Sequence, residues 1–271
     1  MNPDRVGIST AAFYPHYLTE DALNAIGELG FHVVEVFLQA DAEYTARFGA
    51  VLDRRRRELG LEIHSLHLYA TYFDLWSPYP RLAEESRDRF HRLLGLASMV
   101  DAKALTWHGL RYGVEDPDLI RAFFESARWA AEEARDAGLT LCLENVSWCY
   151  LRQPEQVETI READMPVAFT FDAFQAGESG VEPSDLVHAM GDRLRTVHLS
   201  DYRPHGPRHL LPGEGDVDWP ALMRALQATG YGGPLILETA HVTDGDALLA
   251  ARAFVRRIWE RVAGDSDCGS A

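Results

Sequence analysis

The sequence predicts a single (β/α)₈ barrel, an α/β fold in which eight parallel strands form a closed sheet surrounded by outer helices. Three observations predict this fold. The chain has 271 residues, and one such barrel needs roughly 250 residues. Short β-type runs alternate with helical patterns, which implies parallel strands joined by right-handed crossovers. In several of these runs one face is bulky and the other is small or polar.

The predicted strands are runs of aliphatic, aromatic and β-branched residues, each followed by a polar loop. They are Val6–Thr10, His32–Leu38, Leu61–Tyr69, Ala104–His108, Leu139–Val146, Val167–Asp172, Thr196–Asp201 and Leu235–Thr239.

The helical patterns follow the polar loops and end at Gly or Asp residues before the next strand. They include Glu20–Leu29, Tyr44–Leu59, Leu82–Val100, Leu119–Ala137, Pro154–Ala163, Pro220–Thr229 and Gly245–Val262. We expect one barrel domain over residues 1–263 and a short disordered tail over residues 264–271.

The two faces of the strands favour closure of the sheet, because alternate residues of a strand point to opposite sides. In the fifth predicted strand, Leu141 and Leu143 share one face, while Thr140, Cys142 and Glu144 share the other. The fourth, sixth and seventh strands show the same division. Bulky faces suit packing against helices, and small or polar faces suit a barrel interior. The alternative, an open doubly wound sheet, is expected to carry apolar residues on both faces.

Charge and composition limit the classes of partner. A formal net charge of −16 argues against DNA and anionic membranes, which attract basic proteins. Lys103 is the only lysine and begins the fourth strand, far from the expected site, so a Schiff-base aldolase is set aside. The cysteines form no disulfide framework, and neither a signal peptide nor a membrane-spanning run is evident. We expect a cytoplasmic protein without nucleic-acid or membrane partners; a homo-oligomer remains open.

Four ionisable residues, Glu144, Asp172, His198 and Glu238, lie at or near the C-terminal ends of four consecutive predicted strands. Barrel enzymes place their chemistry at this end, and neighbouring strands are about 4.8 Å apart. Carboxylates so close together repel one another unless a cation neutralises them. Three carboxylates with one imidazole suit Mn²⁺, Mg²⁺, Co²⁺ or Zn²⁺. We therefore expect these residues to hold one divalent metal ion.

The local sequence around these residues resembles a known superfamily. The matching segments are CLENV (142–146), FTFDAFQAG (169–177), VHLSD (197–201), LPGEGDVDW (211–219) and LILET (235–239). They are similar to the sugar phosphate isomerase/epimerase superfamily of xylose-isomerase-like TIM barrels, which includes ketose 3-epimerases, 2-keto-inositol and 3-dehydroshikimate dehydratases, and abasic-site endonucleases. The resemblance covers about residues 5–262. It implies that Glu144, Asp172, His198 and Glu238 are the metal ligands and that the two glutamates also act as acid and base.

The chain departs from the superfamily at one position of the sixth strand. Relatives usually carry D-x-x-H there, whereas this chain has Asp172-Ala-Phe-Gln175. Gln175 can hydrogen-bond a substrate hydroxyl, but it does not titrate near neutral pH and is a poor metal ligand. The departure argues against a sugar 3-epimerase but does not affect the four expected ligands.

Further residues are expected to bind a small polyhydroxylated substrate. They are His67, His108, Gln175, Arg208 and Trp107. His67 and His108 end the third and fourth strands, at places where endonuclease relatives bind a further metal. Trp107, with aromatic residues of the loop 69–79, is expected to form a wall on which a sugar stacks. Glu35, on the inner face of the second strand, is expected to have either a buried structural role or a catalytic one.

Two reactions fit the expected site. In the first, an isomerase or epimerase of a sugar or cyclitol uses the cation to stabilise an enediolate while Glu144 and Glu238 transfer the proton. In the second, a dehydratase or lyase of a hydroxy-ketone, of the 2-keto-inositol or 3-dehydroshikimate type, expels hydroxide from the same carbanion. An abasic-site endonuclease is less favoured, given the net charge, Gln175 and Pro207 at additional metal positions. A non-catalytic binding protein is disfavoured by the complete set of ligands. We expect a metal-dependent isomerase or epimerase.

Overall fold

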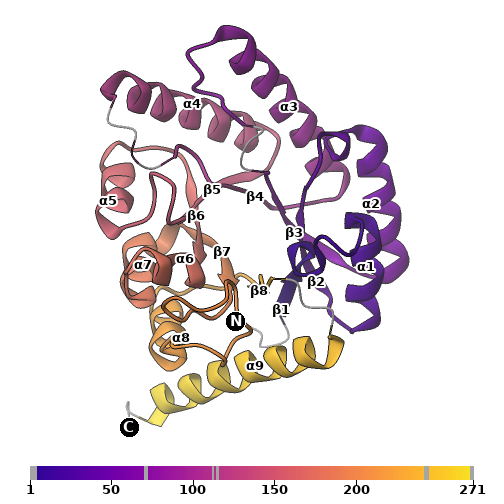
Figure 1. Cartoon of the computed structure of the whole chain (residues 1–271), viewed down its shortest axis with the longest axis vertical. Helices are drawn as coiled ribbons and strands as arrows, with labels where there is room; N and C mark the ends of the chain where they lie inside the picture. Colours follow the sequence, from indigo (N-terminus) through magenta and orange to yellow (C-terminus); the bar gives the residue numbers. More distant parts are fainter. Residues whose placement is uncertain (1–4, 70–72, 112, 114–115, 241–243, 269–271) are drawn as a thin grey trace.

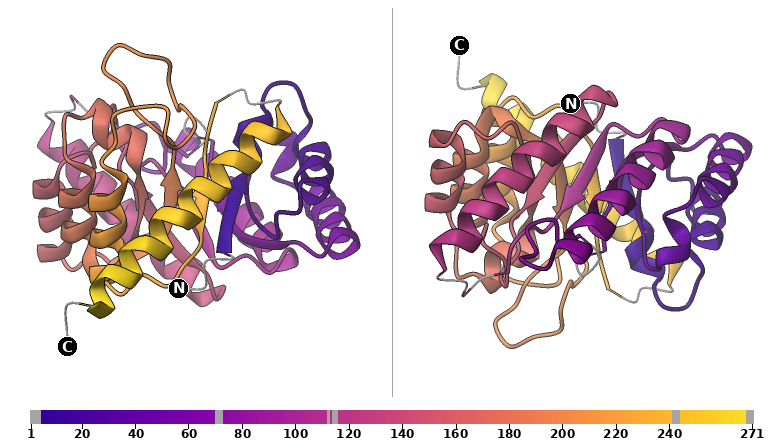
Figure 2. Two further views of the ribbon diagram at one scale, coloured as in Figure 1. Left: turned by 90° about the horizontal axis from the view of Figure 1, so that it is seen from below. Right: turned by 90° about the horizontal axis from the view of Figure 1, so that it is seen from above.

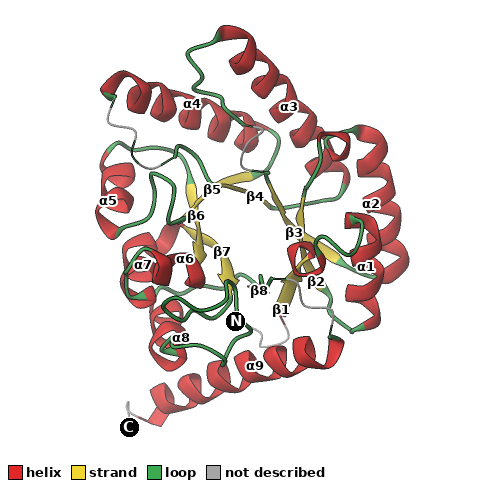
Figure 3. Ribbon diagram, viewed as in Figure 1, coloured by secondary structure: helices red, strands yellow, loops and turns green. Residues whose placement is uncertain are grey.

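The computed structural model describes residues 5–69, 73–111, 113, 116–240 and 244–268. Within them, eight parallel strands form a closed barrel in the order β1 to β8, and the helices surround it (Figures 1 and 3). The barrel closes where β8 pairs with β1, with Val6 opposite Leu235. The predicted single (β/α)₈ barrel is confirmed.

All eight predicted strands overlap with observed ones. The strands are β1 (Val6–Ser9), β2 (Val33–Phe37), β3 (Glu62–His67), β4 (Ala104–Trp107), β5 (Thr140–Glu144), β6 (Ala168–Asp172), β7 (Leu194–Leu199) and β8 (Leu235–Leu237).

Nine α-helices lie in the described part of the chain, with short 3₁₀ helices at Thr10–Phe13, Asp41–Glu43 and Gly191–Arg193. The α-helices are α1 (Thr19–Glu28), α2 (Ala46–Leu59), α3 (Pro80–Met99), α4 (Pro117–Asp136), α5 (Pro154–Glu162), α6 (Ala173–Glu178), α7 (Pro183–Met190), α8 (Trp219–Ala228) and α9 (Gly245–Cys268). Among the helices described, none combines the length and apolar content that crossing a bilayer requires.

Two features of the helices differ from the sequence prediction. Helices α6 and α7 were not among the predicted elements, because six and eight residues give too few turns for a clear helical period. Helix α9 continues to Cys268, so the expected disordered tail is not met for residues 264–268. A long helix can carry its hydrogen-bond pattern into residues of low helix propensity. Residues 269–271 lie outside the described part of the chain.

The outer and inner faces of the strands pack differently. Phe169 and Phe171 are fully buried in the main hydrophobic core, which includes residues of the surrounding helices. A separate small cluster consists of Ala104, Cys142 and Ala168. The hydroxyls of Thr106 and Thr170, on the non-adjacent strands β4 and β6, lie 3.1 Å apart. Small side chains therefore occupy the barrel interior, where space is narrow.

The long connection from β7 to α8, residues 200–218, projects from one end of the barrel (Figure 2). The buried carboxylate of Asp201 holds its base. This carboxylate accepts hydrogen bonds from the backbone N–H of Gly213 at 2.8 Å and of Val217 at 3.1 Å, and from the indole of Trp219 at 2.8 Å. One carboxylate thus joins the start and the end of the connection.

Candidate metal centre and substrate cavity

Four ionisable side chains meet at the carboxyl ends of β5 to β8. Glu144 and Asp172 are the last residues of β5 and β6, His198 is next to last in β7, and Glu238 directly follows β8. One potential ligand atom from each residue lies within 4.8 Å of the others, and all four side chains are buried. The structure therefore brings together the residues that the sequence predicts as metal ligands.

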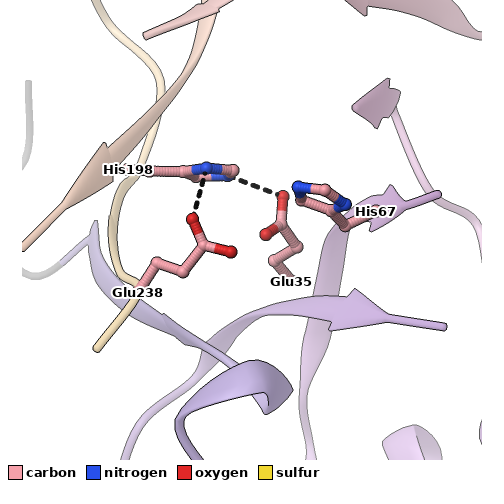
Figure 4. A group of neighbouring side chains, drawn as sticks. All are labelled: Glu35, His67, His198 and Glu238. Atoms are coloured by element: carbon pink, nitrogen blue, oxygen red, sulfur yellow. Dashed lines mark hydrogen bonds and ion pairs between the residues drawn. The ribbon is translucent and has the colours of Figure 1, made fainter. Parts of the chain in front are cut away.

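The imidazole of His198 lies among carboxylates on both sides. Its Nδ1 is 2.9 Å from Oε1 of Glu144 and 2.8 Å from Oε2 of Glu238. The same nitrogen is 4.0 Å from Oδ2 of Asp172. Its Nε2 faces the opposite way and lies 2.9 Å from Oε2 of Glu35 (Figure 4). Sequence reasoning did not find this contact of Glu35.

The carboxylate of Asp172 shows that a cation fits this group. Its Oδ1 accepts a hydrogen bond of 2.6 Å from the backbone N–H of Gln175 and so caps α6. Its Oδ2 is buried and has no hydrogen-bond partner among the described residues. Burying such an oxygen without a partner is costly. An unpartnered oxygen beside two further carboxylates and one imidazole suits a divalent cation.

Burial and neighbouring charges shift the pKa values of the group. Burial and the negative charges of Glu238 and Glu144 raise the pKa of Asp172 well above its usual value. Burial alone would raise the pKa of Glu144, but the charges of three histidines, led by His67, hold it well below its usual value. Burial alone would lower the pKa of His198, but the surrounding carboxylates, led by Glu238, raise it well above its usual value. Without a cation, the crowded carboxylates thus favour protonation of His198 and Asp172.

A second group of residues meets the other oxygen of Glu144. Its Oε2 lies 3.1 Å from Nε2 of His67 and 2.9 Å from Nε2 of His108. The two histidine Nε2 atoms are 3.3 Å apart. Because Oε1 of Glu144 faces His198, this carboxylate lies between the two groups. His67 and His108 are therefore adjacent to the four-residue group.

A cavity of about 330 Å³ is lined by Glu144, Asp172 and Glu238 from this cluster. Its lining also includes the aromatic residues Tyr14, Phe37, Tyr69 and Trp148. Pockets for small molecules have volumes of roughly 300–1,000 Å³ and combine apolar walls with few polar groups. The cavity thus has the size and lining of a site for a small molecule.

Four of the five predicted substrate contacts line the cavity, and the fifth lies outside it. His67, His108, Gln175 and Arg208 line the cavity. Trp107 does not: its side chain is 1% exposed and packs against Phe123, with ring centroids 5.9 Å apart. The prediction for Trp107 is therefore wrong, because its neighbours along β4 face the barrel interior and Trp107 faces the helices. Residues 70–72 of the expected aromatic loop lie outside the described residues.

Gln175 has a defined orientation at the place where relatives carry a histidine. Its Oε1 accepts hydrogen bonds from the backbone N–H and from the hydroxyl of Ser147, both at 3.0 Å. Because the oxygen already accepts two hydrogen bonds, the amide nitrogen is the group that Gln175 can offer to a molecule in the cavity. At this position the cavity therefore has a hydrogen-bond donor that does not titrate near neutral pH.

The connection after β7 contributes Arg208 and His209 to the cavity wall. The Arg208 guanidinium lies 5.3 Å from the ring centroid of Phe174, and the His209 ring is 4.1 Å from the same centroid. His209 Nδ1 also lies 3.1 Å from the hydroxyl of Ser200. His209 and Thr239 also line the cavity, although neither was a predicted contact. The position of His209 next to Arg208 was the one feature of the sequence that could have predicted its role.

Curated proteins with related sequences include two dehydratases and an endonuclease. The chain is 26% identical over 231 residues to a 3-dehydroshikimate dehydratase of Pseudomonas putida, covering 80% of this chain and 35% of that protein. It is 21% identical over 281 residues to an inosose dehydratase of Geobacillus kaustophilus, covering 88% of each. It is 26% identical over 243 residues to a probable endonuclease 4 of Mycobacterium ulcerans, covering 83% and 91%. The chain thus spans about a third of the length of the 3-dehydroshikimate dehydratase, as of one further relative, but most of the length of the other two.

Solved structures with the same fold include sugar epimerases. A D-tagatose 3-epimerase-like protein superposes with a TM-score of 0.82 at 20% identity, covering 97% of this chain and 99% of the other. An L-ribulose 3-epimerase superposes with a TM-score of 0.81 at 21% identity, covering 98% of each. A family model described as a xylose isomerase-like TIM barrel matches residues 23–258. The chain therefore belongs to the xylose isomerase-like TIM barrel family.

Proposed function

We propose that the protein is a metal-dependent isomerase or epimerase of a small sugar or cyclitol. The observation that carries this proposal is the buried group of three carboxylates and one imidazole that borders a cavity of about 330 Å³. The group lies at the carboxyl ends of the strands, where barrel enzymes place their chemistry. The names of the solved neighbours, which are sugar epimerases, support this class of reaction.

In this proposal Glu144, Asp172, His198 and Glu238 hold one divalent ion, namely Mn²⁺, Mg²⁺, Co²⁺ or Zn²⁺. Such an ion, when bound, supplies a Lewis acid that stabilises negative charge on the carbonyl and hydroxyl oxygens of the substrate. The unpartnered Oδ2 of Asp172 and the proximity of the three carboxylates support this ligand set.

Glu144 and Glu238 are the proposed acid and base. They extend from β5 and from the end of β8, lie on different sides of Asp172 in the strand order, and both line the cavity. One carboxylate removes a proton from the carbon beside the carbonyl, and the other returns a proton to the substrate. His67, His108, Gln175 and Arg208 are the proposed contacts of the substrate oxygens; the last two offer N–H donors.

Dehydration of a hydroxy-ketone is a second candidate for the same site. Two observations favour it: Gln175 stands where relatives have a histidine, and two curated relatives are named dehydratases. A glutamate again removes the proton beside the carbonyl. The electron pair then forms a carbon–carbon double bond as hydroxide leaves the β-carbon, so no proton returns to carbon.

Turnover in D₂O separates the two reactions. We incubate the metal-loaded protein with ketoses and keto-inositols and examine the products by mass spectrometry and NMR. An isomerase or epimerase incorporates deuterium at the carbon beside the carbonyl, whereas a dehydratase yields a product lighter by one water that absorbs in the near ultraviolet. We expect deuterium incorporation; loss of water without it would replace the first candidate by the second.

Glu144→Gln and Glu238→Gln test the two carboxylates, because each keeps an oxygen donor and removes the titrating group. We expect either variant to lose ~10²–10⁴-fold in turnover. Glu132→Gln, on the exposed side of α4, is the matched control and keeps full activity. Unchanged turnover in both site variants would contradict the assigned roles.

We propose no nucleic-acid substrate, although one relative is named a probable endonuclease. The net charge of −16 opposes binding to phosphate backbones, and Gln175 replaces a residue that can bind an additional metal. Incision of abasic duplex DNA that depends on Glu144 would overturn this part of the proposal.

A further inference from the structure

Glu35 contacts the proposed metal centre from the other side of the barrel. It lies in the middle of β2, is fully buried, and places Oε2 2.9 Å from Nε2 of His198 (Figure 4). β2 and β7 are not neighbours in the sheet, so this contact crosses the barrel interior. The proposed ligand set does not include Glu35.

Two hydroxyl groups define the role of this glutamate oxygen. Ser65 Oγ donates a hydrogen bond of 2.8 Å to Oε2, and Thr106 Oγ1 donates one of 3.4 Å to the same atom. An ionised carboxylate accepts hydrogen bonds and donates none. Toward His198, therefore, Oε2 is an acceptor, and the hydrogen lies on Nε2 of the imidazole.

The location of this hydrogen decides which nitrogen can bind a cation. With Nε2 protonated, the lone pair of the neutral imidazole is on Nδ1, which lies 2.8 Å from Glu238 and 2.9 Å from Glu144. A carboxylate that receives the second N–H of a ligating histidine orients the ring and selects its tautomer. We propose that Glu35 is a positioning residue that keeps the His198 hydrogen on Nε2 and so assigns Nδ1 to the cation. This inference rests on the proposed metal centre.

Glu35 could instead be a ligand, because one potential ligand atom of Glu35 lies within 4.8 Å of atoms from His67, His198 and Glu238. Glu35 faces Nε2 of His198 through Oε2, however, and this oxygen already accepts a hydrogen bond from Ser65. An ion held by Glu35 would also leave Oδ2 of Asp172 without a partner. The contacts therefore favour the ion on the Nδ1 side.

A purely structural role explains Glu35 less well. Its Oε1 is buried without a hydrogen-bond partner among the described residues. An apolar side chain of similar size would fill the same space without the cost of burying a charge. A charged acceptor at this position is explained by the imidazole that it faces.

The first test measures Mn²⁺ affinity in Glu35→Ala, Glu35→Gln and a control, Thr196→Val, by competition with a fluorescent chelator. Thr196 is buried on β7 two residues before His198, and its hydroxyl lies 3.4 Å from His64, away from the four ligands. We expect Glu35→Ala to bind Mn²⁺ ~10–100-fold more weakly. Glu35→Gln should lose less, because its amide oxygen can still accept from Nε2, and Thr196→Val should match the wild type. Circular dichroism verifies that each variant is folded.

The second test measures the wild-type protein and uses a variant only to assign the signal. Long-range ¹H–¹⁵N NMR of histidine-labelled wild-type protein with Zn²⁺ reports the tautomer of His198, whose signal is assigned by its loss in His198→Asn. We expect a protonated Nε2 and a metal-bound Nδ1. The reverse assignment would overturn the inference, as would wild-type affinity in Glu35→Ala or an equal loss in Glu35→Ala and Thr196→Val.

The outcomes distinguish this inference from the proposed function. If the wild-type protein binds no divalent ion, both fail. If it binds Mn²⁺ and Glu35→Ala binds it equally well, only the role of Glu35 fails. If Glu35 behaves as expected but no sugar or cyclitol is turned over, only the proposed function fails.

Discussion

His198 and Asp172 have raised pKa values at the atoms where a cation would bind. Burial opposes protonation of His198, but the surrounding carboxylates raise its pKa well above the usual value. Burial and two neighbouring carboxylates raise the pKa of Asp172 well above its usual value. A proton on Nδ1 of His198 or on Oδ2 of Asp172 competes with the ion, so binding of the ion must release protons.

We therefore expect the affinity for Mn²⁺ to increase with pH. Because both pKa values are raised, protons compete with the ion at these two residues, and a lower proton concentration favours the ion-bound form. Calorimetry in two buffers of different ionisation enthalpy counts the protons released. Asp172→Asn should release fewer protons in any binding that remains. Affinity that stays constant or falls as the pH rises would contradict the prediction.

The residues of the site were predictable where the backbone alone places them. Glu144 and Asp172 end neighbouring parallel strands on the inward face, so their approach follows from strand spacing and alternation. The contact between Glu35 and His198 was not predictable, because it depends on how side chains of non-adjacent strands meet inside the closed barrel. Trp107 shows the converse error: alternation placed it outside, and a role in the cavity wall contradicted that alternation.

At the scale of elements, the proposed metal centre and part of the cavity wall depend on different segments of the chain. The proposed ligands lie on or directly after strands, whereas Arg208 and His209 lie in residues 200–218 and depend on the anchoring of that segment. Asp201 provides the anchor through acceptors for three N–H groups in residues 213–219. Substrate binding and metal binding should therefore respond differently to loss of this carboxylate.

We expect Asp201→Ala to raise KM for the substrate more than it lowers kcat, and to leave Mn²⁺ affinity near the wild-type value. Loss of a buried acceptor leaves N–H groups unpaired, at a cost of at least about 2 kcal/mol in the free energy of unfolding. Steady-state kinetics, chelator competition and urea unfolding provide the three measurements. Asp216→Ala, an exposed position in the same segment, is the control. A large loss of Mn²⁺ affinity in Asp201→Ala alone would refute this separation.

The regular elements were predictable to different degrees. Strands such as β6 and long helices such as α4 display several periods of their pattern, so their positions follow from the sequence. Helices α6 and α7 are short, and their formation depends on local caps: the Asp172 side chain caps α6, and Pro183 occupies the start of α7. A prediction based on periodicity cannot detect elements that are defined by one or two residues.

For the molecule as a whole, ion binding and stability should be linked. The proposed ligands come from β5, β6, β7 and the end of β8, so an ion that binds all four binds the folded barrel and not the unfolded chain. Mn²⁺ at 100 times its Kd should stabilise the fold by about 2.7 kcal/mol. Differential scanning fluorimetry should show Tm higher by several degrees, with no increase in Glu238→Ala. An unchanged Tm in the wild type at this concentration would contradict a single site built from these strands.

The closed architecture was predictable because several independent signals agree. Length, alternation of strands and helices, and small inward residues such as Ala104, Cys142 and Ala168 all favour a barrel. The identity of the substrate does not follow from these sequence patterns. It depends on distances between a few groups around the cavity, for example Gln175 and Arg208, and on the position that a substrate adopts among them.

Closure of the barrel also completes the proposed metal centre. Along the chain Glu35 comes first, Glu144 follows, and Glu238 is the last of the three. A nascent chain that stops before β8 has three of the four ligands and an open sheet. The pairing of β8 with β1 closes the sheet and at the same time brings in the last carboxylate, that of Glu238. A cation that needs all four proposed ligands therefore favours the form in which β8 has paired with β1 over any form in which the sheet is still open.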